Sequence, residues 1–100
     1  MKIPRRIIVC GMEWSIRLSD TLSLQDPPLW GDCDHERKTI EISSDHPQTN
    51  VVFHETVHAI SESMGYDPTE KQVDEITCSV LSFFQANKPF IRWLLEELAD

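Results

Sequence analysis

Two histidines and a glutamate stand at a spacing that suits metal-dependent hydrolysis. His54, Glu55 and His58 form the pattern H-E-x-x-H. On a helix, residues four apart share one face, so both imidazoles can bind one zinc ion while Glu55 lies beside it. Zinc lowers the pKa of a water molecule to about 7, and Glu55 is then the expected general base, which takes the water proton and passes it to the leaving amine.

Catalytic zinc normally has three protein ligands, so a third ligand must be found among the nearby carboxylates of Glu62, Glu70, Asp74 and Glu75. On the next predicted helix, Glu75 projects away from the apolar stripe, whereas Glu70 and Asp74 lie on its flank. A carboxylate there is costly unless a cation or a hydrogen-bond donor meets it. We therefore predict that Glu70 is the third ligand and that Asp74 accepts the free ring N–H of a ligating histidine. Glu62 is expected on the solvated surface.

Other interpretations of these residues remain open. Alternatively, Glu70 is an acidic residue in the first turn of the helix, and its negative charge stabilises the helix N-terminus. A short H-E-x-x-H pattern can arise by chance, in which case the chain is a small α+β interaction module without a metal. Cys33 and His35 offer two more ligand atoms, although their spacing matches no common zinc pattern. His46, just ahead of the motif, is a candidate to line the cleft.

Composition limits the class of protein. The chain has 100 residues, 40% of them hydrophobic and 26% charged, which predicts a single domain over residues 1–100. Its 9 basic and 17 acidic residues give a net charge of −8, which disfavours nucleic-acid binding. We see neither a signal peptide nor a membrane segment. Three widely spaced cysteines, Cys10, Cys33 and Cys78, favour a reducing cytosol over a disulfide framework.

The first half of the chain reads as strands. Alternating apolar and polar residues over 6–18 predict one strand, and residues 19–28 predict a loop that ends in two prolines. The segments on either side of residues 34–37 predict a hairpin. Its second strand carries Ile40 and Ile42 in alternation with Glu41, which we interpret as an edge strand. About three strands are expected in all.

The second half reads as helices. An apolar repeat predicts a helix from near Pro47 to Gly65, and this helix carries the H-E-x-x-H motif. Asp67 is the expected N-cap of a second helix that has Pro68 at its first position and runs to about Asn87. A short third helix follows residue 89. Strands followed by helices predict an α+β fold. The expected core-facing stripe of the second helix is Val73, Ile76, Thr77, Val80 and Phe84.

Several segments together resemble a known family. They are W-G-x-C-D and T-I-E-I in the first half, VVFHETVHAISE, and EKQVDEITCSVLSFFQANKP. Over nearly its whole length the chain is similar to the minimal zincin-fold metallopeptidases of bacteriophages and prophages, to ImmA/IrrE-type peptidases and, more distantly, to thermolysin-like gluzincins. Gluzincins place their third ligand and an aspartate at the spacing of Glu70 and Asp74. Ser61 and Met64 stand where metzincins need Gly and His. The resemblance implies a zincin-like fold and, for a phage protein, the cytosol of a bacterial host.

We therefore expect a zinc metallopeptidase that hydrolyses a peptide or protein substrate. Zincin substrates run along an edge strand, and the expected one is the segment Ile40, Glu41, Ile42 and Ser43. The chain departs from larger gluzincins because only 11 residues separate the motif from Glu70. No residue is diagnostic as oxyanion donor, and the nearest candidates are Tyr66, His46 and Arg92. The alternative is a regulatory or binding protein that keeps the metal site without useful peptidase activity.

Overall fold

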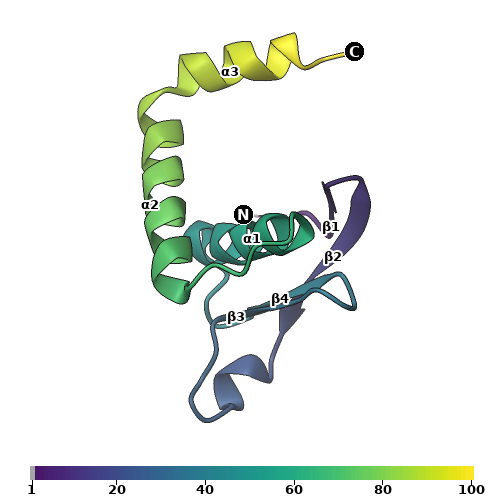
Figure 1. Cartoon of the computed structure of the whole chain (residues 1–100). Coiled ribbons are helices and arrows are strands. Elements are labelled where there is room, and N and C mark those ends of the chain that lie inside the picture. Colours follow the sequence, from purple (N-terminus) through teal and green to yellow (C-terminus); the bar gives the residue numbers. More distant parts are fainter. Residues whose placement is uncertain (1) are drawn as a thin grey trace.

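The computed structural model describes residues 2–100 and has the predicted α+β fold. Four strands precede three α-helices in this part of the chain. Their bounds are β1 Arg6–Val9, β2 Met12–Ser19, β3 Gly31–Asp34, β4 Thr39–Ser43, α1 Thr49–Ser63, α2 Glu70–Ala86 and α3 Lys88–Glu97, with a 3-10 turn, η1, at Leu22–Leu24. In Figure 1, α1 lies over the sheet and α2 starts beside α1, while the far end of α2 and α3 turn away from both.

The sheet order β1-β2-β4-β3 overturns one expectation about the site. β4 pairs in parallel with β2 on one side and antiparallel with β3 on the other. The prediction that Ile40, Glu41, Ile42 and Ser43 form an edge strand is therefore wrong, and the edges belong to β1 and β3. Ile40, Ile42 and Ser43 are fully buried. The sequence pattern hid this because alternation reports which face of a strand is buried, and not whether its sides are paired.

The segment predicted as a single strand over residues 6–18 is a hairpin of β1 and β2. Cys10 and Gly11 form its tight turn with φ angles of 50° and 81°. Positive φ at both central residues is typical of the turns that match the right-handed twist of paired strands. The one hairpin that the sequence predicts, between β3 and β4, is confirmed.

The core lies between the sheet and α1. Trp14 of β2 and Ile40 and Ile42 of β4 are fully buried, and they join Val51 and Ala59 of α1 in one cluster. Burial of each large side chain contributes about 1.5–3 kcal/mol. This packing fixes α1 across the middle of the sheet and so sets the direction in which its polar residues face.

α2 begins differently from the prediction. Thr69, and not Asp67, is the N-cap: its side chain accepts the N–H of Gln72, whose own side chain accepts the N–H of Thr69. This reciprocal pair is a capping box. Gly65, with φ of 85°, follows the end of α1 as predicted.

The buried residues of α2 all lie in its first half. Val73 and Thr77 are buried, whereas Ile76 and Phe84 are exposed, so the predicted core-facing stripe is only partly correct. α3 has no buried residue. Among residues 2–100, no helix is both long and apolar enough to cross a membrane.

Candidate metal centre

Two imidazoles and one carboxylate converge where α1 meets the start of α2. His54 and His58 lie one turn apart on α1, with ring centroids 5.0 Å apart. Both point their Nε2 atoms at Glu70, the first residue of α2: Oε2 lies 2.9 Å from His54 and Oε1 lies 2.8 Å from His58. The structure thus brings together the three residues predicted as ligands. In the part of the chain that the structure describes, they form the one group of three potential ligand side chains whose donor atoms lie within 4.8 Å of one another.

The position of Glu70 bears on the alternative that it serves the helix end. Thr69 and Gln72 already cap α2, and the Glu70 carboxylate faces the imidazoles. Glu75, another candidate ligand, lies on the outer side of α2 beside Lys71, 4.0 Å away. Of the carboxylates considered on α2, Glu70 alone contacts both histidines.

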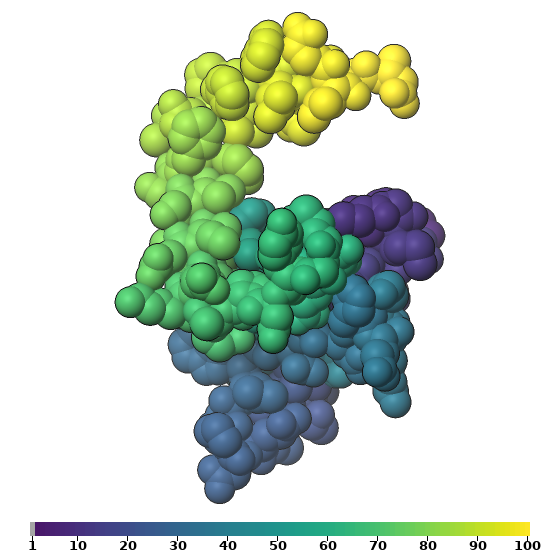
Figure 2. Space-filling view, in the orientation of Figure 1, coloured from purple at the N-terminus to yellow at the C-terminus, as the bar shows by residue number. Residues whose placement is uncertain are grey.

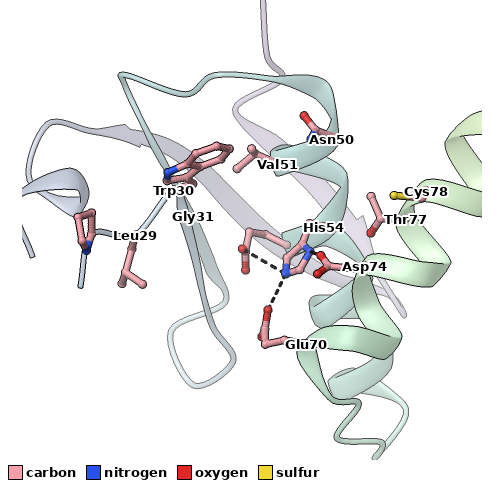
Figure 3. A pocket seen from close by; sticks show the side chains of 12 residues that line it. Leu29, Trp30, Gly31, Asn50, Val51, His54, Glu70, Asp74, Thr77 and Cys78 are labelled. Carbon is pink, nitrogen blue, oxygen red and sulfur yellow. Dashed lines mark hydrogen bonds and ion pairs between the residues drawn. The ribbon is translucent and has the colours of Figure 1, made fainter. Parts of the chain in front are cut away.

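Asp74 lies one turn further along α2, on the other side of the His54 ring. Its Oδ1 is 2.9 Å from His54 Nδ1, as Figure 3 shows. A carboxylate only accepts hydrogen bonds, so this contact fixes a proton on Nδ1. In the neutral ring Nε2 then carries a lone pair, and this lone pair faces a Glu70 oxygen, which is also an acceptor. Either a proton or a metal cation between the two atoms would satisfy both of them.

The distances in the triad suit a small divalent ion. Tetrahedral zinc with bonds of about 2.0–2.1 Å separates its ligand atoms by roughly 3.3 Å. The nitrogen–oxygen distances of 2.8 and 2.9 Å need to open by about 0.5 Å to reach that value. The Glu70 side chain is 74% exposed, so its carboxylate has room to move by this amount.

Glu55 is buried beside the triad. It is 8% exposed, and its Oε2 lies 4.0 Å from His54 Nε2. Burial raises the pKa of Glu55 to about 7; the charge of His54 opposes this rise, and the carboxylates of Glu70, Asp32 and Glu62 add to it. A carboxyl group that titrates near neutrality is suited to exchange protons with a reacting group.

Gly31 makes the room that Glu55 occupies, a role that the sequence did not reveal. A methyl group at Gly31 would lie 2.9 Å from both Cγ and Oε2 of Glu55. The third nearest atom, Cδ of the same side chain, would lie 3.2 Å away. A side chain at position 31 would therefore displace the carboxylate. No local signal marks this glycine, because β3 and α1 meet only in the folded chain.

The prediction that Glu62 is solvated surface is wrong. Its carboxylate is half-buried on the far side of His58, with Oε1 4.0 Å from His58 Nδ1. Its Oε2 lies 3.9 Å from both His35 Nδ1 and Cys33 Sγ. Burial, followed by the nearby negative charge of Glu62, raises the pKa of the Cys33 thiol to about 12. The four-residue spacing between His58 and Glu62 was the signal for this contact.

A cleft of about 380 Å³ opens beside His54, Glu55 and Glu70. Its other walls come from the edge strand β3 with the preceding loop, from α1 and from the first half of α2 (Figure 3). The remaining lining residues are Pro28, Leu29, Trp30, Gly31, Asn50, Val51, Asp74, Thr77 and Cys78. None of the three candidate oxyanion donors is among these lining residues.

His46 reaches this region indirectly. Its ring stacks on Trp30 with centroids 4.0 Å apart and an angle of 12° between the planes. Trp30 is half-exposed and lines the cleft. The stack supports the rim of the cleft and does not place a His46 nitrogen among the cleft-lining groups.

Comparisons with protein-family models, with curated proteins and with solved structures find no match for this chain.

Proposed function

We propose that the protein is a zinc-dependent metallopeptidase. The observation that carries this proposal is the convergence of His54 and His58 Nε2 on the Glu70 carboxylate, next to buried Glu55 and an open cleft. Two histidines and a glutamate with an open fourth position are a ligand set of catalytic zinc. Bound zinc would supply Lewis-acid chemistry, polarising a carbonyl group and lowering the pKa of water.

Each residue of the site then has a task. His54, His58 and Glu70 would hold the metal, and Asp74 would keep His54 in the tautomer whose Nε2 is free to bind. Glu55 would take the proton of the attacking water on a carboxylate oxygen and donate it to the leaving nitrogen. In the metal-free chain burial raises its pKa to about 7, within the range suited to a general acid and base.

The substrate that suits this cleft is an extended peptide segment. β3 is an edge strand, and Gly31 at its start lines the cleft beside Glu55. An edge strand offers unpaired backbone groups to which a peptide can add as another strand. β3 therefore replaces the segment 40–43 as the proposed substrate strand. We also propose a cytosolic location, which suits the three free cysteines.

The second candidate function is a regulatory or binding protein that uses the metal site without hydrolysis. It is favoured by one observation: Tyr66, His46 and Arg92, the candidate oxyanion donors, are not among the residues that line the cleft. Such a protein would bind the same metal and the same extended peptide, and it would release no product.

Metal content tests the ligand assignment. We expect about one zinc per chain by elemental analysis of the wild type and a strong loss in Glu70→Ala. Glu75→Ala is the matched control, because Glu75 is on the same helix and faces solvent beside Lys71, so its zinc content should stay at the wild-type level. Equal loss in the two variants would contradict the assignment of Glu70.

Cleavage of a peptide library separates the two candidate functions. We expect turnover by the wild type and none by Glu55→Gln, which should keep its zinc because Glu55 is not a ligand. Zinc-loaded wild type without turnover would favour the binding protein. Loss of both zinc and turnover in Glu55→Gln would contradict the assignment of Glu55 as general base.

A further inference from the structure

The distal half of α2 and the whole of α3 form an arm that stands off the body, which we define as residues 80–98. In Figures 1 and 2 this segment, light green to yellow, curves away from the sheet and α1. α3 has no buried residue. Seven large apolar side chains of the arm are between 37% and 71% exposed: Phe83, Phe84, Phe90, Trp93, Leu94, Leu95 and Leu98. We call this set the apolar arm face.

The apolar arm face is linked to α1 by a series of aromatic rings. Phe53 of α1 contacts Phe84 edge to face at 6.3 Å. Phe83 contacts Phe90 across the bend between α2 and α3 at 5.7 Å, and Phe90 contacts Trp93 at 5.6 Å. Neighbouring Phe83 and Phe84 complete a series of rings from α1 to α3. A series of this kind, open to water along its length, is typical of an interface and not of a monomer surface.

The exposed area of the chain is large for its mass. The protein exposes 7375 Å², whereas a compact monomer of 11.6 kDa exposes about 5,800 Å². Its radius of gyration is 14.2 Å, against about 13 Å for a compact chain of this length. The excess of about 1,500 Å² exceeds the roughly 800 Å² that each partner contributes to a standard interface. The arm also needs a partner, because an unpacked helix of ten residues such as α3 is marginal in water.

We propose that the apolar arm face pairs with the same face of a second copy of this chain to form a two-fold symmetric dimer. Arg92 and Glu96 lie on the side of α3 opposite Leu94 and Leu98, so two copies can meet without burying these charges. Glu97 lies on the same side as Phe90 and Trp93, but it is the last residue of α3 and so stands at the end of the face. A two-fold interface uses one self-complementary patch, and an apolar patch is complementary to itself. Amphipathic helices also bind anionic membranes, but the net charge of −8 on this chain disfavours such a membrane as the partner.

The mass of the protein in solution tests the dimer. Sedimentation equilibrium of the full chain is measured from about 1 to about 200 µM, a range that covers the dissociation constant expected for a stable pair. At the upper end, the mass should be twice the 11.6 kDa chain mass. The double variant Leu95→Glu/Leu98→Glu should weaken dimerisation roughly 100-fold, because it places four charges in the interface of each dimer. Both leucines are more than 60% exposed and take part in no ring contact of the series, so the fold of the body should persist in circular dichroism. Arg92→Ala, on the charged side of α3, is the control and should remain dimeric.

Two results would overturn the proposal. One is a wild-type protein that stays monomeric over the whole concentration range. The other is a dimer whose dissociation constant is unchanged by the double variant, since the interface would then lie elsewhere. In the first case, binding of the monomeric wild type to phosphatidylcholine vesicles would assign the arm to a lipid surface instead. These readouts need neither zinc nor substrate, so they stand apart from the test of the proposed function.

Discussion

Replacement of Gly31 by alanine should separate catalysis from metal binding. The new methyl group would lie 2.9 Å from Cγ and Oε2 of Glu55, whereas carbon atoms normally approach to about 3.5–4.0 Å. The Glu55 carboxylate must therefore move by about 0.6–1 Å. The backbone itself accepts alanine, because Gly31 lies in β3 and is not one of the glycines with positive φ.

The magnitude follows from two opposing effects. Crowding of a packed site costs about 1–3 kcal/mol. Alanine in a strand recovers about 0.5–1 kcal/mol relative to glycine, so we expect a net loss of about 1–2 kcal/mol in the free energy of unfolding. If Glu55 is the general base proposed above, its displacement by about 1 Å should lower kcat about 100-fold. Zinc content should not change, because the three atoms nearest to the new methyl group all belong to Glu55.

The assay combines urea unfolding, elemental analysis and hydrolysis of a peptide cleaved by the wild type. Gly11→Ala is the matched control, because it strains the backbone but crowds no side chain. Its methyl group would meet nothing within 4 Å, but its φ of 81° disfavours a side chain. We therefore expect Gly11→Ala to lose about 1 kcal/mol of stability while zinc content and kcat stay at wild-type values.

Wild-type stability together with wild-type kcat in Gly31→Ala would refute the reasoning, because Glu55 would then have room that the structure does not give it. Loss of zinc from Gly31→Ala would also contradict it, since the methyl group would have disturbed the ligands. Unfolding is measurable without any substrate, so the crowding of Glu55 is tested even if the protein hydrolyses no peptide.

Three further predictions concern burial. In chelator-treated protein, the pKa of Glu55 is about 7, against 4.5 in the unfolded chain. The stabilisation that this difference gives is complete below about pH 4.5 and is lost as the pH rises through about 7. The free energy of unfolding in urea should therefore shift in favour of Glu55→Gln, relative to the wild type, by about 3 kcal/mol between pH 4 and pH 8. A stability difference that does not change with pH would contradict this. Mass spectrometry at pH 8 should find that iodoacetamide alkylates exposed Cys10 and Cys78 first, because the pKa of Cys33 is raised to about 12; equal rates would be contrary evidence. Thr77→Val should raise Tm by about 4–8 °C, since the buried hydroxyl has no hydrogen-bond partner among residues 2–100; a lower Tm would reveal one.

The sequence by itself determined what local interactions control. H-E-x-x-H lies on a helix as predicted, with both imidazoles on one face, because side chains four apart share a face wherever the helix packs. Gly65 follows the end of that helix because glycine accepts positive φ. The apolar stripe on the first half of α2 was enough to place Glu70 and Asp74 on its flank, and there the structure has them in contact with His54.

The tertiary structure decided everything that depends on which segments meet. β4 lies inside the sheet because it pairs directly with β2, although β3 lies between them in the sequence, and alternation of apolar residues carries no information about such a partner. Gly31 makes room for Glu55 only because α1 packs on β3. Glu62 is half-buried, and not on the solvated surface as predicted, because the hairpin of β3 and β4 places His35 next to it. Each of these contacts joins residues far apart in the chain, so its energy is absent from any local pattern and arises only when the core has formed.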